Sequence, residues 1–525
     1  MNCSRHTYWQ RVLVLLIALT TVQTGLAATR RVPQDHDSIQ AAIAAAEQGD
    51  TILVAPGKYR ERVQLKPGIV LRSEGDDSRA RSQGLQRAEL TVLDGGEQAQ
   101  NAPGVVMAEG STLDGFTITN VGRYDEAQWR KHHESQGEEL GDDEGSIQAE
   151  GSIPAIRISS VNCTVVNCLI HHNGDVGIGI LGKIKTGAAP LVASNFVYRN
   201  MGGGIGIADG AEPLVRGNHC YENLRAGIGC RQANPILTDN VCFQNIRAGI
   251  GCREGSSPVM RGNQCYGNRR SGIGLRMVGT NPIVEGNACY ENDMAGIGCR
   301  DGAGPIIRKN VCRKNRLAGI GCSAGAKPLV VNNDCRENQT AGIGLQSQAT
   351  AIIEGNLCID NHFVGIGITE GSSATVSGNQ LSRQGGQPPM IAVKDGSTAT
   401  IRDNRISGGG VAAVLVQGQA TLSGNIFTGM DQKQGNAVWI WEKSTATITD
   451  NTFNGYRSAV LAIKSTVLLS GNQVTNFRGT AFTIKDSPQP SHAYKNTATS
   501  ADPKAKVIEL EGLSGIVDEN VLMKE

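Results

Sequence analysis

The sequence predicts an all-β protein, a single-stranded parallel β-helix whose coils of 22 to 24 residues stack into a solenoid. Three observations support this fold class. An asparagine recurs every 22 to 24 residues over nine consecutive copies. Within each copy, apolar residues alternate with a period of two, as in short strands. The 67 glycines among 525 residues exceed the average share of roughly 7 % and indicate many tight turns. Strands this short cannot bury a face alone, whereas stacked coils can.

The recurring asparagine marks the register of the coils. We expect its side-chain amides to stack into ladders along the solenoid. Residues 190–380 carry the most regular repeats, and about sixteen coils would give a rod about 75 Å long. The regular positions are Asn195, Asn218, Asn240, Asn263, Asn287, Asn310, Asn333, Asn356 and Asn379, and looser copies follow at Asn404, Asn425, Asn451 and Asn472.

The chain opens with a predicted signal peptide over residues 1–28. Arg5 and Arg11 precede an apolar run over residues 12–22, and small residues follow up to Ala28. This pattern is typical of a secretory signal and predicts a secreted or periplasmic protein. No later apolar stretch is long enough to span a bilayer, so we expect no membrane insertion. Residues 29–525 are predicted to form one β-helix domain, and we expect a monomer.

A short helix is predicted to cap the first coil. Asp37-Ser-Ile-Gln40 matches a capping box, and apolar residues with helical spacing follow from Ile39 to Ala46. Gly49 would end this helix, which we place over residues 37–49. Its apolar side would cover the open strand edges of the first coil.

Thirteen of the fourteen cysteines follow the predicted signal peptide, and most occupy two positions of the repeat. Leu275, Leu345 and Ile368 replace cysteine at one of these positions, which marks it as part of the core. We expect stacked, buried and mostly free thiols; disulfides along the stack and binding of a soft metal such as Cu(I) are the alternatives. The two sets are Cys220, Cys242, Cys265, Cys289, Cys312, Cys335 and Cys358, and Cys230, Cys252, Cys299 and Cys322.

One outer face combines bare backbone with positive charge. The second glycine of each Gly-Ile-Gly points outward, and arginines flank it on both sides. Residues 201–345 hold 17 Lys and Arg against 11 Asp and Glu, although the whole chain has a net charge of +1. Guanidinium groups bind carboxylates and sulfates bidentately. The flanking rows are Arg225, Arg247 and Arg270, and Arg231, Arg253, Arg276 and Arg300.

Two interpretations of this face stay open. The arginines can bind an extended acidic polysaccharide, which the predicted compartment favours over nucleic acid. They can equally form a solvated surface that neighbouring acids neutralise. Those acids are Glu222, Glu254, Glu291 and Asp301. A column of aromatic residues from Tyr198 to Tyr290 is expected to stabilise the turns by stacking, with a sugar platform as the alternative.

An acidic insertion over residues 123–150 interrupts the repeat. It contains nine acidic and three basic residues, together with Trp129 and two histidines. We expect a surface loop, because long connections without a pattern are of this kind, and a disordered acidic loop is the simplest form of it. It could cover the arginine face as a lid, or bind Ca²⁺ through Asp142, Asp143 and Glu144. No other cofactor and no metal ligand is assigned.

The segment from Ser38 to Glu61, followed by the Asn and Gly-Ile repeats, resembles the right-handed parallel β-helix superfamily. That superfamily includes pectate and pectin lyases, mannuronan epimerases and the NosD-like accessory protein of nitrous oxide reductase maturation. The resemblance covers nearly the whole chain after residue 28 and is specific for the fold. It implies a protein that interacts with acidic polysaccharide, as a lyase, as a non-catalytic binding module, or alternatively as a NosD-like copper-handling protein.

A uronate lyase needs a cation against the carboxylate, a base for the C5 proton and an acid for the leaving oxygen. The resemblance implies that Arg231, Arg253 and Arg276 neutralise the carboxylate or act as the base. A hydrolase would instead need paired carboxylic acids, and no close pair is evident. The Asp-Pro-His-Asp motif of the epimerases does not occur. Candidates for Ca²⁺ ligands or catalytic helpers are Asp209, Glu254 and Asp301.

Overall fold

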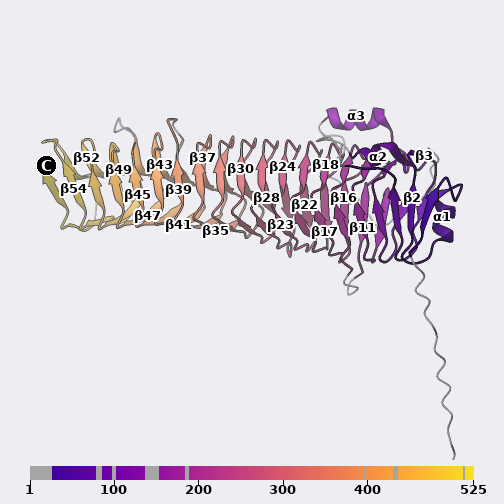
Figure 1. Cartoon of the computed structure of the whole chain (residues 1–525). Helices are drawn as coiled ribbons and strands as arrows, with labels where there is room; N and C mark the ends of the chain where they lie inside the picture. The colour runs from indigo at the N-terminus through magenta and orange to yellow at the C-terminus, as the bar shows by residue number, and fades with distance from the viewer. Residues whose placement is uncertain are drawn as a thin grey trace, which may run out of the picture.

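The protein is an elongated stack of parallel strands, seen from the side in Figure 1. In this computed structural model the N-terminal coils lie at one end and the C-terminal coils at the other. The structure describes residues 27–77, 85–96, 102–135, 153–183, 188–386, 388–394, 396–429, 435–511 and 515–524. The predicted signal peptide therefore lies almost entirely outside the described residues.

Each regular coil contains three short strands, one in each of three parallel sheets. One coil consists of β17 (Leu214–Arg216), β18 (His219–Tyr221) and β19 (Ile228–Arg231), which belong to sheets A, B and C respectively. The strands of successive coils pair in register, so that Ile228 lies beside Ile250 and Cys220 beside Cys242. Equivalent residues thus form straight columns along the rod.

The three sheets extend over the length of the described chain. Sheet A runs from β1 (Thr29–Val32) to β56 (Val517–Asp518), and sheet B from β3 (Gly57–Tyr59) to β57 (Val521–Lys524). Sheet C runs from β4 (Val63–Gln64) to β55 (Lys506–Glu511).

The expectation of about sixteen coils was too low. In the described part of the chain, sheet A contains 20 strands, which corresponds to a stack about 90 Å long at the usual strand spacing. The difference arises at the ends, because terminal strands such as β2 (Thr51–Val54) and β5 (Val70–Ser73) belong to coils without the full repeat.

A single apolar core fills the inside of the solenoid. Inward positions of all three sheets contribute to it, as Val215, Cys220 and Ile228 do in one coil, and all three are fully buried. The core is continuous from Val32 to Ala505. The period-two pattern therefore has the predicted cause, burial of one side of each short strand.

Two asparagine ladders hold the turns in register, which confirms the predicted stacking. Between sheets A and B, each Asn from Asn195 to Asn496 donates from Nδ2 to Oδ1 of the next ladder residue, at 2.8–3.1 Å. A second ladder runs between sheets B and C from Asn173 to Asn361, at 2.9–3.1 Å.

The predicted N-terminal helix is present but shorter. Helix α1 spans Ile39–Ala45, and Ser38 Oγ accepts a hydrogen bond from the backbone N–H of Ala41 at 3.1 Å. The predicted capping box over Asp37–Gln40 is wrong, because the N-cap is Ser38 and not Asp37. Glu61, from another segment, accepts the N–H groups of Ile39 and Gln40. The buried side of α1 joins the core, and its role as an end cap stays a prediction.

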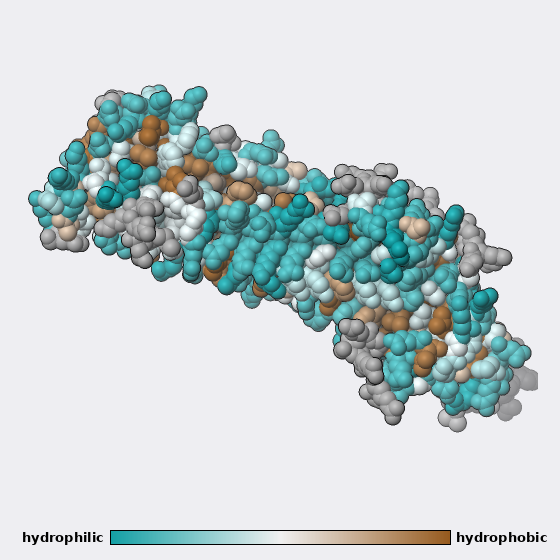
Figure 2. Space-filling model, turned by 90° about the horizontal axis from the view of Figure 1, so that it is seen from above, coloured by the Kyte–Doolittle hydropathy of each residue, from teal (hydrophilic) through white to brown (hydrophobic). Residues whose placement is uncertain are grey.

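Two further helices lie outside the solenoid. They are α2 (Gln86–Leu90) and α3 (Glu126–Glu134), and α3 stands above the coils in Figure 1. Seen from above in Figure 2, the rod is curved, and rows of hydrophilic side chains cover its middle. Among the described residues, no helix has the length and apolarity that crossing a membrane requires.

Candidate functional site

The arginine-lined face is the outer surface of sheet C. Its central strands repeat one pattern in which Ile and Cys or Leu point inward while Gly and Arg point outward. Register pairs Arg231 with Arg253 and Arg276 with Arg300, so the arginines form a row along the rod. The strands concerned are β19 (defined above), β22 (Ile250–Arg253), β25 (Ile273–Arg276) and β28 (Ile297–Arg300).

Packing requires the first glycine of each Gly-Ile-Gly. A Cβ atom at Gly249 would lie 2.8 Å from the carbonyl oxygen of Gly272 and 2.9 Å from Nδ2 of Asn268. Gly272 and Gly296 are equally confined. Side chains longer than hydrogen would therefore collide with the next coil and with the second asparagine ladder.

Packing does not require the second, outward glycine. A Cβ at Gly251 would come no closer than 3.8 Å to another heavy atom, and one at Gly274 no closer than 3.5 Å. At Gly298 the nearest atom, at 2.7 Å, is the hydroxyl oxygen of Ser271, which can rotate away. Glycine within a strand lowers stability by roughly 0.5–1 kcal/mol relative to alanine. The column of outward glycines therefore reduces stability although packing would accept a larger side chain.

Acidic residues neutralise part of the row that follows the glycines. Arg231 contacts Asp209 at 3.3 Å, and Arg253 contacts Glu254 at 3.3 Å. Asp301 contacts both neighbouring arginines, Arg276 at 3.2 Å and Arg300 at 3.5 Å. The interpretation as a neutralised surface is therefore right for these pairs, whereas Glu222 contacts Arg199 instead.

Positive charge nevertheless remains in excess on this face. Seven arginines line it, with Arg225, Arg247 and Arg270 in the row before the glycines. The carboxylate of Asp175 acts on Arg225 in addition to the three carboxylates above. Burial lowers the pKa of the Arg225 and Arg253 guanidinium groups, and each has a nearby arginine that lowers it further. Arg231 Nε is buried and has no hydrogen-bond partner among the described residues. The face therefore combines closely spaced guanidinium groups with one buried N–H donor, that of Arg231 Nε.

The structure brings all the predicted site residues to this one face. The acids Asp209, Glu254 and Asp301 directly follow strands of sheet C, at positions with φ of 56°, 54° and 57°. These acids form ion pairs with arginines. Their role as catalytic helpers stays a prediction, as does the role of the arginines in catalysis. Described histidines such as His171 and His219 lie on sheet B.

Comparison with protein families identifies the fold. A family model described as "Right handed beta helix region" matches residues 154–277, 243–381 and 389–521. The protein belongs to this family. The sequence-based resemblance and the right-handed fold class are thereby confirmed. No curated protein matches the sequence.

Several solved structures are similar to this chain at low sequence identity and low TM-score. The A-module of a mannuronan C-5 epimerase from Azotobacter vinelandii is 17 % identical, with a TM-score of 0.41, over 75 % of this chain and 94 % of that one. A PL6-family alginate lyase is 13 % identical, with a TM-score of 0.37, over 94 % of this chain and 89 % of that one. An α-1,3-glucanase of Streptomyces thermodiastaticus is 14 % identical, with a TM-score of 0.44, over 68 % of this chain and 64 % of that one.

The acidic insertion of this β-helix protein begins with a docked helix, which corrects the expectation of a loop without structure. Trp129 of α3 is 3 % exposed and packs on Leu224 and Ile246. Its Nε1 donates to the carbonyl of Glu222 at 3.1 Å, and Arg199 lies over its ring at 4.2 Å. Trp129 is a single apolar residue in a charged segment that does not repeat, so the periodic pattern of the sequence could not predict its docking.

Helix α3 lies beside the arginine face. Leu224 and Ile246, on which it packs, directly precede Arg225 and Arg247. The proposed Ca²⁺ ligands Asp142, Asp143 and Glu144, and the rest of the suggested lid, lie outside the described residues. Within the described ranges, no group of three or more His, Cys, Asp or Glu side chains could hold a metal ion.

The cysteines lie inside the solenoid. All thirteen described cysteines are buried and unpaired by disulfides, as predicted. Contact with the thiol of the preceding coil, and burial, raise the pKa of Cys242 and its counterparts up to Cys358. Burial raises the pKa of Cys322 to about 12. Copper coordination by this column would need thiolates in place of these protonated thiols.

The aromatic column lies on the strands of sheet B and not in the turns. The rings of Tyr198, Tyr221, Phe243, Tyr266 and Tyr290 stack face to face with centroids 4.7–5.0 Å apart. The expectation of stacking is confirmed, and the position in the turns is wrong. Because each ring covers the face of the next, the middle of the column offers edges to solvent and no open ring face for a sugar.

Proposed function

We propose that the outer face of sheet C binds an extended acidic polysaccharide along the axis of the rod. The observation that carries this proposal is the outward glycine column, which packing does not require and which two rows of arginine flank. A flat floor of this kind lets a polymer approach the backbone closely. Guanidinium groups on both sides match carboxylate or sulfate groups of the polymer.

The regular spacing of the arginines supports an extended ligand. Each coil advances by about 4.8 Å, so successive guanidinium groups recur along the axis at that interval. A linear polyanion can contact several of them at once, and several weak contacts on one chain add up to high avidity. Export to the periplasm or outside the cell, predicted from residues 1–28, would place the protein where such polymers occur.

A retention experiment tests this proposal. The full-length mature protein is applied to immobilised polyuronate and eluted with a salt gradient. We expect retention that weakens with salt, and clearly earlier elution of the double variant Arg247→Ala/Arg270→Ala. The matched control is Arg402→Ala/Arg405→Ala, which removes two positive charges from sheets A and B.

The outcomes separate specific binding from general charge attraction. Elution of the control pair with the wild type supports the proposed face. Equal weakening by both pairs, or no retention of the wild type on polyuronate or sulfated glycan, would refute it. The same mixtures show whether the polymer is cleaved, because β-elimination yields an unsaturated product that absorbs in the ultraviolet.

A further inference from the structure

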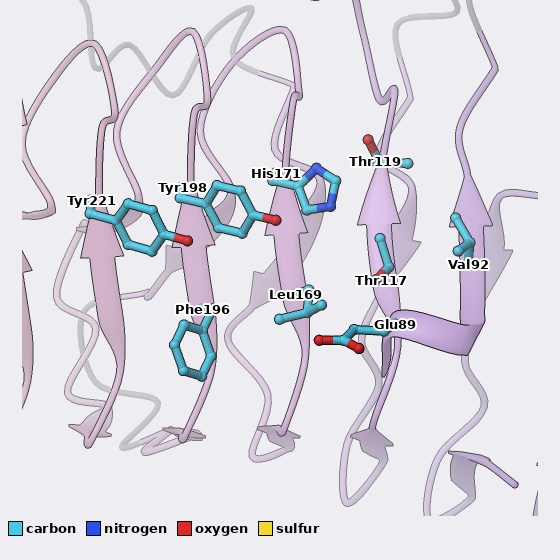
Figure 3. Close-up of a pocket in the computed structure, with 9 residues that line it drawn as sticks. All are labelled: Glu89, Val92, Thr117, Thr119, Leu169, His171, Phe196, Tyr198 and Tyr221. Atoms are coloured by element: carbon cyan, nitrogen blue, oxygen red, sulfur yellow. The ribbon is translucent and has the colours of Figure 1, made fainter. Parts of the chain in front are cut away.

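A hollow lies on a different face, the outer surface of sheet B near its N-terminal end. It has a volume of about 340 Å³ and is bounded by helix α2 on one side and the start of the aromatic column on the other. Figure 3 shows side chains from several neighbouring strands around it. Its lining includes Glu89, Leu169, His171, Phe196, Tyr198 and Tyr221.

The helical wall of this hollow is firmly anchored. Arg87 of α2 is 3 % exposed and binds Asp77 at 2.6 Å and Asp114 at 2.7 Å. Thr117, on strand β9 (Thr117–Thr119), donates from Oγ1 to the carbonyl of Ala88 at 2.7 Å. The carboxylate of Glu89 is therefore presented from a fixed segment and not from a loose loop.

The floor of the hollow is apolar and includes an aromatic ring. Phe196 belongs to β15 (Phe196–Tyr198) and Leu169 to β12 (Leu169–His171). One face of the Phe196 ring stacks on His219 of the next coil, with centroids 4.6 Å apart. On the other side its register partner is the aliphatic Leu169. Unlike Tyr221, Phe243 and Tyr266, Phe196 thus has an aromatic neighbour on one side alone among the described residues.

Polar groups stand around this floor. In Figure 3 the hydroxyl groups of Tyr198 and Tyr221 point along the rod axis toward α2, and the carboxylate of Glu89 lies near Leu169. Burial, together with the neighbouring His172, lowers the pKa of His171 to about 4. Its imidazole is therefore neutral at ordinary pH. Its Nδ1 lies 2.7 Å from Nδ1 of His172, which leaves Nε2 to donate or to accept one hydrogen bond.

We propose that this hollow binds one neutral pyranose unit of a glycan, with the sugar ring against the apolar floor of Phe196 and Leu169 and its hydroxyl groups near Glu89, His171 and Tyr198. A volume of this size is at the lower end of small-ligand pockets, in which an apolar lining and a few polar groups are usual. Glu89 is the charged group in the lining, and it disfavours uronate and sulfated units. The site differs from the arginine face in both position and charge, and does not depend on its function.

Ligand-observed NMR on the full mature protein tests this site. The probes are methyl glycosides of glucose, galactose and mannose, with methyl glucuronide as the charged comparison. We expect saturation transfer to at least one neutral glycoside and none to the glucuronide. Phe196→Ala should abolish the transfer, whereas Phe243→Ala, whose ring is stacked on both sides, should leave it unchanged.

A second variant separates recognition from structural damage. Glu89→Gln keeps the shape of the wall and removes its charge, so it should weaken binding of the neutral glycoside at least threefold and admit the glucuronide. Arg247→Ala/Arg270→Ala should leave neutral binding unchanged. The proposal is overturned by absence of transfer to every neutral glycoside, by transfer that persists in folded Phe196→Ala, or by a preference of the wild type for the glucuronide.

Discussion

At the scale of single residues, the two glycines of Gly-Ile-Gly have different functions. The first glycine is confined by the next coil and by an asparagine amide, whereas a Cβ atom on the second, outward glycine would have free space. The sequence shows both as the same repeated letter. The distinction depends on where a Cβ atom would point, which becomes visible once the coils are stacked.

Substitution at these two positions should therefore have opposite effects. Gly251→Val should leave the free energy of unfolding unchanged or raise it by up to about 1 kcal/mol, because valine favours strands. The same variant should weaken polyuronate binding about tenfold by obstructing the floor. Gly249→Val should destabilise the fold by about 1–3 kcal/mol, as overpacking does. Thermal melting and the retention assay measure both effects, and equal destabilisation by the two variants would contradict the distinction.

At the scale of structural elements, the columns of thiols are predicted to be unreactive toward thiol reagents in the native protein. All thirteen described cysteines are buried, so a thiol reagent should find almost none of them reactive in the native protein. After denaturation without reductant, all thirteen should react. Fast reaction of several thiols before unfolding would contradict the enclosed column, and fewer than thirteen after unfolding would reveal disulfides.

Helix α3 is an added element whose attachment depends mainly on one side chain. Trp129→Ala removes the indole from its contacts with Leu224 and Ile246, and truncation of a buried tryptophan costs about 3–5 kcal/mol. Residues 126–134 should then lose protection against hydrogen exchange, while the solenoid melts as before. Arg130→Ala is the control, since this side chain is 62 % exposed. Retained protection in Trp129→Ala would show that other contacts hold the helix.

The repeating elements were predictable and the added ones were not. A residue such as Asn240 or Cys242 meets the same neighbours in every coil, so its periodic recurrence reveals its place. Arg87 and Trp129 each occur once, and their contacts depend on segments distant in the sequence. For that reason the ladders, the core and the arginine rows could be derived from spacing, whereas α2, α3 and the hollow beside Phe196 could not.

At the scale of the whole molecule, stability should be distributed coil by coil. Each coil contacts mainly its two neighbours, as in other solenoids. Asn287→Ala removes an amide that donates to Asn310 and Met260 and accepts from Asn263. Each buried group left unpaired costs about 1–3 kcal/mol, so the variant should lower the melting temperature and split unfolding into two transitions. Asn281→Ala, an exposed control, should melt like the wild type, and a single unchanged transition in Asn287→Ala would argue against a coil-by-coil description.

The second asparagine ladder has a consequence for the thermodynamics of any ligand on sheet C. It fixes the turns between sheets B and C. Each of these turns carries one arginine of the row, two residues after the ladder asparagine; these are Arg225, Arg247 and Arg270. The backbone beneath the arginine row is thus ordered before a ligand arrives. On the side of the protein, binding then loses side-chain entropy but no backbone entropy of a loop, in addition to the loss of ligand freedom that every association carries. The ladder that registers the coils also preorganises the row of cations.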